Sequence, residues 1–336
     1  AWRNVIMAAL IAAVPANSML AAAGAANAVA DYTLEVEIDP ATHLLKVSAD
    51  IRLQEIYAGR TVEFLLSDAV EVVGSSVPLK RLAYDGEAGF TGINGSSVDL
   101  AETGHVARYS LTLPADTTQF TLDYRGAVNF ALGGQKEQYT RGFQSTAGII
   151  NEQGIYLAGS SLWYPYFSNE LVSFRLSSNV PDGWHLISQG NGTSRDAAGN
   201  SAWDSSGDVD EIYLVGGPLQ KYSEPAGAVA AEVYLRETDD ALAQRYLDAT
   251  AQYLEMYRNL IGPYPYGKFA LVENFWETGY GMPSFTLLGP QIIRFPFILT
   301  SSYPHEILHN WWGNSVFVDY ASGNWCEGLT AYMADH

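Results

Sequence analysis

The run His305-Glu306-Ile307-Leu308-His309 constrains the fold of this chain more than any other segment. On an α-helix, residues four apart lie on one face, one turn above each other, so His305 and His309 can present their imidazole nitrogens to a single tetrahedral metal ion. Glu306 then points beside the metal, where its carboxylate can take a proton from a metal-bound water whose pKa is lowered to about 7. The run therefore predicts a helical zinc site that carries its own general base. A solvated helical face is the alternative, and it is disfavoured because two tryptophans follow at positions 311 and 312.

A third protein ligand must come from elsewhere, because a catalytic zinc ion keeps its fourth position open for water. Glu327 is the candidate, and Asn324 could cap the helix that carries it. Asp319 is the alternative third ligand, since ligation by a carboxylate needs only reach and geometry. Cys326 could be a fourth ligand, but a helical neighbour of Glu327 points about 100° away from it. A small buried side chain is therefore the expected role of Cys326, and as the only cysteine it excludes an intrachain disulfide.

The residues around these candidate ligands form a longer pattern. Asn310-Trp311-Trp312-Gly313-Asn314 continues the first run, and Glu327-Gly328-Leu329-Thr330-Ala331-Tyr332 follows downstream. Together they resemble the zinc signature of the aminopeptidase N family, the gluzincins that also include leukotriene hydrolase. The metzincin pattern does not fit, because the positions where it needs glycine and histidine hold Trp312 and Ser315. The spacing between His309 and Glu327 is one residue short of the family's usual spacing, which a loop between two helices can absorb.

The resemblance implies a fold and an activity. The fold is α+β, with an N-terminal antiparallel β saddle or sandwich domain followed by the start of a thermolysin-like zinc peptidase domain. The cofactor is one Zn²⁺ ion held by His305, His309 and Glu327, and Glu306 activates the attacking water. The partner is a peptide substrate. The family's oxyanion tyrosine lies downstream of the third ligand, beyond His336, so the chain is expected to be a fragment of uncertain activity.

The first 30 residues have the pattern of a signal peptide. Arg3 precedes an apolar run over residues 5–14, and small residues then lead to Ala28-Val29-Ala30, an A-x-A cleavage site before Asp31. An uncleaved anchor is the alternative, but Pro15 interrupts the run before the about 20 apolar residues that a membrane helix needs. The mature chain is therefore expected to be exported, periplasmic or extracellular, without stable membrane insertion.

The charge of the chain excludes one class of partner. The formal net charge is −19, from 37 acidic and 18 basic residues. Binding to phosphate backbones requires a basic surface, so nucleic acid is not an expected partner.

Alternating strands dominate residues 31–227. Residues 32–38 and 45–51 alternate apolar and polar side chains around a turn at Asp39-Pro40, which predicts a hairpin. Further short runs of this kind occur at 61–66, 109–113, 120–124, 172–176 and 212–215. Polar and glycine-rich turns separate them. The pattern indicates an antiparallel β domain, a sandwich or a saddle.

The period changes near residue 228, where the catalytic domain, residues 228–336, is expected to begin. After a strand at 230–235, Asp239 and Asp240 can cap a helix that runs to about Ile261, before Gly262-Pro263 stops it. Its expected apolar stripe is Leu242, Tyr246, Ala249, Tyr253, Met256, Tyr257 and Leu260. A strand at 270–273 follows, and Pro304 falls in the expected first turn of the zinc helix.

One departure from the family limits the function. Where the family has its exopeptidase motif GAMEN, whose glutamate binds the free α-amine of the peptide, this chain has Gly281-Met282-Pro283-Ser284. Gly281 and Met282 match and are expected to line the substrate. Proline offers neither a carboxylate nor an N–H, so the usual amine anchor is absent. Glu273, Glu277 or an acid elsewhere could take its place.

Two hypotheses follow for the function. The first is a zinc-dependent peptidase, aminopeptidase-like, with Glu306 as its base. The second is a non-catalytic relative that keeps the fold and the zinc site for binding or assembly, and Pro283 and Ser284 prompt it. An intact Glu306 argues against the second, since a structural metal site has no use for that carboxylate.

Overall fold

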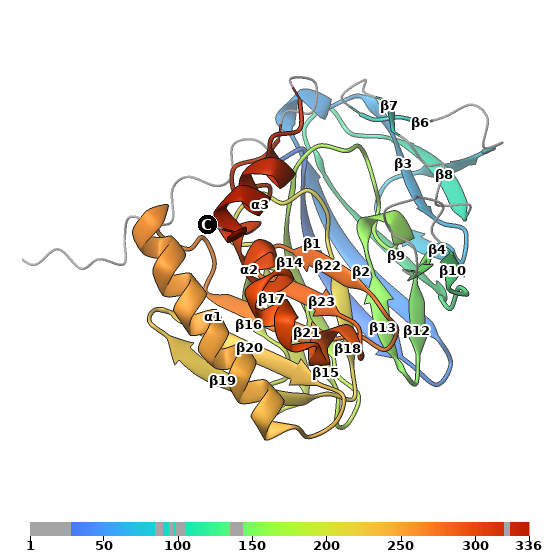
Figure 1. Ribbon diagram of the computed structural model, residues 1–336. Helices are drawn as coiled ribbons and strands as arrows, with labels where there is room; N and C mark the ends of the chain where they lie inside the picture. The colour runs from blue at the N-terminus through green and yellow to red at the C-terminus, as the bar shows by residue number, and fades with distance from the viewer. Residues whose placement is uncertain are drawn as a thin grey trace, which may run out of the picture.

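The computed structural model describes residues 28–84, 90–93, 97–98, 105–134, 144–318 and 323–335. These residues form a β-rich first part and a second part in which helices cover a mixed sheet (Figure 1). The α+β expectation is therefore confirmed. Residues 1–27 of the expected signal peptide lie outside the described residues. Val29 and Ala30 are described, and both are buried at the start of the first strand.

A seven-stranded sheet organises the first part. Its order is β16 (Asn191–Thr193), β17 (Asn200–Asp204), β14 (Val172–Asn179), β1 (Ala30–Asp39), β2 (Leu44–Leu53), β9 (Gln119–Ala127) and β4 (Val70–Ser75). The expected hairpin is β1 with β2, and Leu34 pairs with Ala49 in its antiparallel register. Apolar and polar side chains alternate along β1, so they point to opposite faces of the sheet. Leu34 and Val36 are buried, whereas Glu35 and Glu37 face outward.

The first part is antiparallel, as expected, except at one strand pair. β14 pairs with β1 in parallel, with Leu34 opposite Leu176. A parallel neighbour needs a long connection that returns the chain to the same end of the sheet. The chain between these two strands supplies that connection, and short periodic runs give no signal for such a distant pairing.

Smaller sheets complete the first part. They are β3 (Thr61–Ser67), β8 (Val106–Thr112) and β5 (Leu79–Leu82) in one sheet, and β12 (Ile149–Asn151), β13 (Gly154–Leu157), β18 (Leu214–Gly217) and β15 (His185–Ile187) in another. Two short pairs are β6 (Phe90–Thr91) with β7 (Ser97–Val98) and β10 (Gly133–Gly134) with β11 (Gln144–Ser145), and the 3₁₀ turns are η1 (Glu55–Tyr57) and η2 (Gly159–Ser161). All five further short runs predicted from the sequence overlap strands, two of them in the seven-stranded sheet and three in the smaller sheets.

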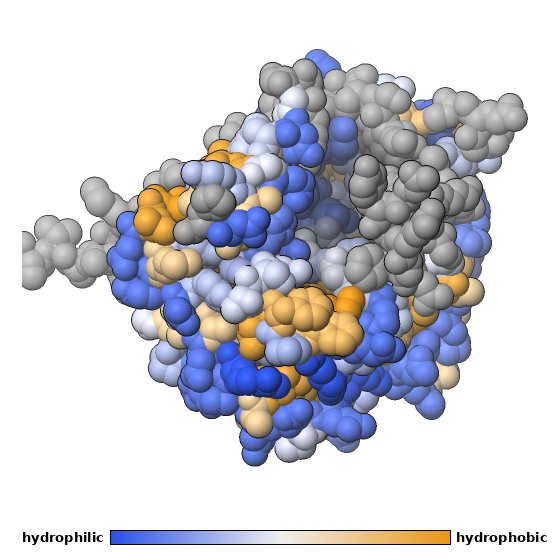
Figure 2. Space-filling model, viewed as in Figure 1, coloured by the Kyte–Doolittle hydropathy of each residue, from blue (hydrophilic) through white to orange (hydrophobic). Residues whose placement is uncertain are grey.

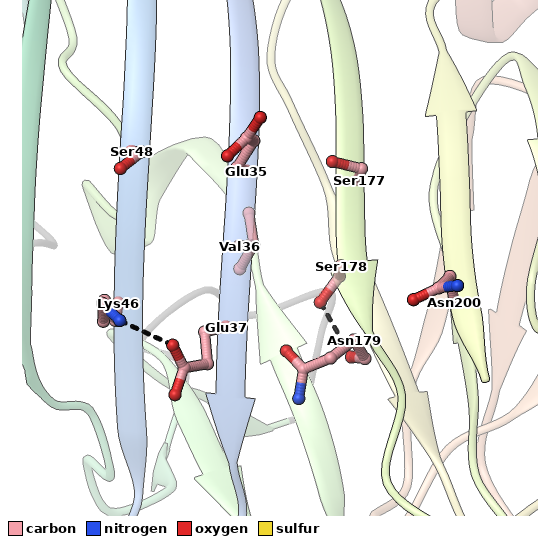
Figure 3. Close-up of a pocket in the computed structure, with 9 residues that line it drawn as sticks. All are labelled: Glu35, Val36, Glu37, Lys46, Ser48, Ser177, Ser178, Asn179 and Asn200. Carbon is pink, nitrogen blue, oxygen red and sulfur yellow. Dashed lines mark hydrogen bonds and ion pairs between the residues drawn. The ribbon is translucent and has the colours of Figure 1, made fainter. Parts of the chain in front are cut away.

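The outer face of the seven-stranded sheet carries a hollow of about 580 Å³ (Figure 3). Its lining consists largely of short polar and charged side chains from neighbouring strands, such as Ser48, Ser177 and Asn200. Lys46 bonds to Glu37 within it, at 2.7 Å. This ion pair is half exposed, as is usual on a solvated sheet face.

The second part is built on a five-stranded sheet. Its order is β19 (Gln220–Ala226), β20 (Val229–Leu235), β21 (Lys268–Glu273), β23 (Phe285–Leu288) and β22 (Gly279–Met282). β19 pairs along its whole length with β20, so this sheet begins at Gln220, before the domain boundary expected at residue 228. β22 is its edge strand, and among the described residues no strand pairs with its other side.

The long helix α1 (Asp240–Leu260) connects the parallel strands β20 and β21, as a crossover requires. Asp239 caps it, because its side chain accepts a hydrogen bond from the Leu242 backbone N–H at 2.9 Å. The expected stripe is wrong at its end, since Met256 and Leu260 are exposed. The buried face is instead Leu242, Ala243, Tyr246, Leu247, Thr250, Leu254 and Tyr257. Met256 and Leu260 therefore face away from the core, while Tyr257 between them packs into it.

The end of the chain carries the remaining helices: η3 (Ile292–Arg294), η4 (Pro296–Thr300), α2 (Ser302–Leu308) and α3 (Cys326–Asp335). Pro304 lies in the first turn of α2, as predicted. Trp311 is buried against Tyr257 and Tyr264, so this segment is not a solvated face. Within the described residues, no helix is long and apolar enough to cross a membrane.

Candidate metal centre and its pocket

Helix α2 presents the two histidines as the sequence predicts. His305 lies in its second turn and His309 is its C-terminal cap, and their Nε2 atoms are 2.9 Å apart. The Nδ1 atom of His309 lies 3.0 Å from the Trp312 carbonyl oxygen. Because a carbonyl only accepts, Nδ1 must carry the proton, which leaves the Nε2 lone pair of His309 free to face a metal ion.

Glu327, in the first turn of α3, meets both histidines. Its Oε2 lies 3.2 Å from His305 Nε2, and its Oε1 lies 3.4 Å from His309 Nε2. Ligands bound to zinc at about 2.0–2.1 Å in a tetrahedron are about 3.3 Å apart, so this group has the dimensions of three corners of a zinc site. The three residues form the one group of potential metal ligands found among the described residues. Asp319, the alternative third ligand, lies outside the described residues.

The turn before α3 places Glu327. The Asn324 Oδ1 accepts a hydrogen bond from the Cys326 backbone N–H at 3.2 Å, which forms an Asx turn just before the helix. The cap position itself belongs to Trp325, whose carbonyl oxygen accepts the first helical bond, from the Leu329 N–H. Cys326 is buried, and its Sγ lies 3.1 Å from the Trp312 carbonyl oxygen and 3.6 Å from His309 Nδ1. The thiol therefore lies on the side of the His309 ring opposite to the metal-facing Nε2.

Glu306 lies beside the ligands and against the edge strand. A methyl group added at Gly281 of β22 would collide with the Glu306 Oε2 atom, so only glycine leaves room for the carboxylate in this position. Burial raises the pKa of Glu306 to about 7, and repulsion from Glu327 adds to the effect. A divalent cation at the three ligands would favour the charged form of Glu306, which a base requires.

A pocket of about 350 Å³ surrounds these groups. Its lining consists of Asp210, Gly279, Tyr280, Gly281, His305, Glu306, His309, Gly313, Asn314, Asn324, Cys326 and Glu327. The face that carries α2 and α3 is hollowed beside α3, and hydrophilic residues lie along the side of the hollow next to α3 (Figure 2). Among the described residues of this lining there are three carboxylates but neither lysine nor arginine. The pocket is therefore suited to cationic ligands.

The residues expected to bind substrate are only partly brought to this pocket. Gly281 lines it, whereas the Met282 side chain is buried in the core. Glu273 is buried, and its carboxylate bonds to Arg294 at 2.6 Å and to the Arg236 backbone N–H at 2.8 Å. Glu277 accepts a hydrogen bond from the Gln291 backbone N–H at 2.8 Å. Neither Glu273 nor Glu277 is part of the lining, so substrate contact by these two acids remains an expectation from the sequence.

Sequence reasoning missed the polar groups that hold this site together. The Asn310 Oδ1 accepts a hydrogen bond from the Ser284 backbone N–H at 2.6 Å, and the Ser284 hydroxyl lies 2.6 Å from Lys268 Nζ. It also did not single out Asp210, which comes from the first part of the chain. The acidic run at residues 208–211, within a strand-rich segment, was the available signal.

Comparisons with known proteins agree with this architecture. No family model matches the chain. Human aminopeptidase B is 25% identical over 202 residues, which cover 53% of this chain and 29% of that protein. The chain therefore matches less than a third of the length of this relative.

Solved structures share the fold at low sequence identity. The M1 zinc metallopeptidase from Deinococcus radiodurans has a TM-score of 0.64 at 15% identity, covering 93% of this chain and 70% of that chain. The same metallopeptidase has been solved as a mutant bound to a Tyr-Ser-Ala substrate, with a TM-score of 0.61 at 15% identity, covering 93% of this chain and 70% of that chain. Yeast LTA4 hydrolase has a TM-score of 0.58 at 14% identity, covering 86% of this chain and 44% of that chain. The sequence match and the shared fold together support the chain as a divergent member of the M1 zinc metallopeptidases, the aminopeptidase N family, over the part of the family's length that it covers.

Proposed function

We propose that the chain is part of a zinc-dependent peptidase, aminopeptidase-like, with Glu306 as its general base. One observation carries this proposal: Glu306 lines the same pocket as three side chains that have the spacing of zinc ligands. A structural zinc site uses four protein ligands, whereas this group has three and opens into a pocket. A carboxylate next to an open metal position is the arrangement that hydrolysis requires.

When bound, zinc would lower the pKa of a coordinated water to about 7 and polarise the scissile carbonyl. His305, His309 and Glu327 would hold the ion, and the Trp312 carbonyl would fix the orientation of the His309 ring. Glu306 Oε2 would accept the proton of the attacking water and deliver it to the nitrogen of the leaving amine. This transfer balances the hydrolysis, because one carboxylate and one amine form from the peptide bond and water.

The edge strand suggests how a peptide would lie. In the part of the chain that the structure describes, one side of β22 has no strand partner. β22 also runs past Glu306 at Gly281, so an extended peptide could add to the sheet there. The metallopeptidase from Deinococcus radiodurans has been solved with a Tyr-Ser-Ala substrate. By this likeness we propose short peptides as the substrate class.

The test is a comparison of Glu306→Gln with the wild-type protein, both loaded with one zinc ion per chain. The amide keeps the shape of the side chain and cannot accept the proton, so turnover of an internally quenched peptide should fall by about 100-fold or more. Glu152→Gln, at an exposed hairpin turn, is the matched control and should keep full turnover. Equal turnover by Glu306→Gln and wild type would contradict the proposal.

A non-catalytic relative is the second candidate, and the turn after β22 favours it. Pro283 and Ser284 are buried there and offer no carboxylate to a substrate amine. Steady hydrolysis of the quenched peptide by zinc-loaded wild type excludes this candidate, whereas zinc binding without any turnover supports it.

We also propose an exported location, periplasmic or extracellular. Its support is the leader pattern of residues 1–30, and fractionation of cells that express the full sequence would test it. Retention of the whole chain in the cytoplasm would contradict export.

A further inference from the structure

Lys268, the first residue of β21, is buried beside the turn that ends β22, outside the lining of the pocket. Its Nζ atom donates to the Ser284 hydroxyl oxygen at 2.6 Å and lies 3.3 Å from the Ser284 carbonyl oxygen. The rings of Trp203 and Phe285 have their centres 4.7 and 5.5 Å from Nζ. Within the part of the chain that the structure describes, the amino group thus directs its hydrogen bonds to Ser284.

Packing alone does not explain a lysine at this position. Glu232 is the acid that acts on its charge, but this carboxylate is bound to Lys221 at 2.7 Å and to the Tyr234 hydroxyl at 2.7 Å. Burial lowers the pKa of Lys268 to about 7, Glu232 opposes the shift and Lys221 adds to it. An amino group buried without its own acid partner costs free energy that an apolar side chain of similar length would not.

Ser284 is costly in a second way. Met282 of β22 pairs with Phe285 of β23, so Pro283 and Ser284 form the two-residue turn between these strands. The φ of Ser284 is 68°, a left-handed value that glycine adopts with less strain than serine. Such strain collects at functional sites, where the surrounding contacts maintain it. Serine offers here what glycine lacks, a hydroxyl group for Lys268.

Three segments of the chain meet at Ser284. Its hydroxyl oxygen also accepts a hydrogen bond from the Gly190 backbone N–H of the first part, at 2.9 Å. Its own N–H donates to the Asn310 side chain, which follows His309 directly in the sequence. Lys268 adds the central strand β21 to this junction. The end of β22 is therefore held from three directions.

The same strand faces the proposed base. At Gly281, three residues before Ser284, a Cβ atom would collide with Glu306 Oε2. A small shift of β22 would therefore change the surroundings of the Glu306 carboxylate. It would also move the strand edge along which a peptide could lie.

We propose that Lys268 is a positioning residue for the reaction: its amino group holds Ser284, and Ser284 holds β22 in the place that proton transfer by Glu306 requires. This inference rests on the proposed peptidase function of the pocket. Lys268 touches neither substrate nor metal in this scheme. Without its amino group, one of the two hydrogen bonds that the Ser284 hydroxyl oxygen accepts is lost, and the end of β22 can move relative to Glu306.

A double-mutant cycle tests whether Lys268 acts through Ser284. Lys268→Met and Ser284→Gly, each loaded with zinc, should lower kcat/KM for the quenched peptide by roughly tenfold, since a misplacement of about 1 Å can cost about 100-fold. Glycine suits the left-handed backbone at position 284, so this variant loses the hydroxyl without added strain. The double variant should be no slower than about twofold below either single variant, because both remove one contact.

Lys221→Met separates positioning from stability. It removes a lysine of the same sheet and leaves the buried Glu232 without its ion pair, so it should lower the midpoint of urea unfolding. Its kcat/KM should nevertheless stay within about twofold of wild type, because a folded protein with unchanged site geometry keeps its rate. Zinc affinity should be unchanged in all these variants, since the ligands lie on α2 and α3 or directly after α2.

Hydrogen exchange gives a measurement that needs no turnover. Deuterium uptake of the segment 279–284 should rise in Lys268→Met, whereas uptake of β20 should match wild type. Unchanged kcat/KM in both single variants would overturn the proposal, as would losses that multiply in the double variant. Equal rises of uptake in β20 and β22 would show general loosening and would also overturn it. If wild type had no turnover, the peptidase function would fail by itself, and uptake by β22 would still decide whether Lys268 holds this strand.

Discussion

The side-chain oxygen of Asn310 lies 2.6 Å from the backbone nitrogen of Ser284, and this hydrogen bond ties the segment that follows His309 to the turn between β22 and β23. The Asn310 amide nitrogen donates to the Ile307 carbonyl oxygen at 3.0 Å. Asn310 is fully buried, and Ser284 has a left-handed backbone with φ of 68°. One amide thus fixes the distance between Glu306 and the edge strand that Glu306 faces.

Replacing Asn310 by alanine should therefore destabilise the protein. The Ser284 N–H would stay buried without its acceptor, which costs about 1–3 kcal/mol. Urea unfolding followed by circular dichroism measures this change in the free energy of unfolding. Asn259→Ala is the control, because Asn259 makes an exposed hydrogen bond on α1, and its loss should cost less than about 0.5 kcal/mol. If both variants lost equally little, Asn310 would not have this role.

The buried amino group of Lys268 should make stability depend on pH. Its Nζ lies 2.6 Å from the Ser284 hydroxyl and 4.7 Å from the centre of the Trp203 ring. Burial lowers the pKa of Lys268 to about 7, although Glu232 partly opposes the shift. Above pH 7 the folded protein releases this proton, whereas the unfolded chain keeps it up to about pH 10.4. The unfolded state then binds more protons, so a rise in pH favours folding.

We expect the free energy of unfolding to gain up to about 1.4 kcal/mol per pH unit from this group between pH 7 and 9. Lys268→Met replaces the amino group by an apolar side chain of similar length, which cannot titrate. This variant should therefore lose the gain. Lys80→Met, at an exposed position, should leave the slope as in wild type. The measurement is the difference in slope between variant and wild type in urea titrations at several pH values. Identical slopes for Lys268→Met and wild type would show that Lys268 does not titrate in this range.

Local patterns of the sequence predicted much of the fold and of the site. The i, i+4 spacing predicted that His305 and His309 lie together, and their Nε2 atoms do. The preference of aspartate for helix N-caps predicted the start of α1, where Asp239 accepts a hydrogen bond from the Leu242 N–H. Strand alternation predicted the hairpin of β1 and β2 with its buried face. These features depend on residues close in the chain, so a single sequence carries their signal.

Features that depend on distant segments could not be predicted in this way. The parallel pairing of β14 with β1, the contact of Lys268 with Ser284 and the entry of Asp210 into the pocket each join segments far apart in the chain. The stripe of α1 failed at Leu260, which is exposed although Tyr257 before it is buried and Ile261 after it packs against the core. Periodicity predicts that a helix has an apolar face, but not which residues of that face contact the core.

Adding a methyl group at Gly281 should lower activity strongly with little loss of stability. The new Cβ would collide with Glu306 Oε2, the flexible end of a side chain, so the carboxylate can move aside while the backbone stays. A misplacement of about 1 Å can cost about 100-fold in rate. We expect Gly281→Ala to lower kcat/KM for the quenched peptide by about this factor, with zinc content unchanged.

Gly328→Ala provides the comparison for this variant. A Cβ at Gly328 meets nothing within 4 Å, although the residue follows Glu327 directly on α3. Its activity should match wild type, and the helix should gain slightly because alanine is the better helix former. Full activity of Gly281→Ala would mean that Glu306 does not act from the position described here.

Removal of the Cys326 thiol should leave zinc binding largely intact. The Sγ atom lies 3.6 Å from His309 Nδ1, on the far side of the ring from the Nε2 atom that would hold the metal, so the thiol cannot complete the site without a rearrangement. Competition with a chromophoric chelator measures both the zinc content and the zinc affinity. Cys326→Ala should bind one zinc ion per chain, with an affinity weakened less than about tenfold. Tenfold is the lower end of the affinity losses seen when groups that contact metal ligands are removed. Glu327→Gln should weaken the affinity by more than about 100-fold, because a ligand itself is lost. If both variants lost zinc affinity equally, the thiol would be one of the ligands. The centre would then be a closed site of four protein groups, which leaves no open position for water.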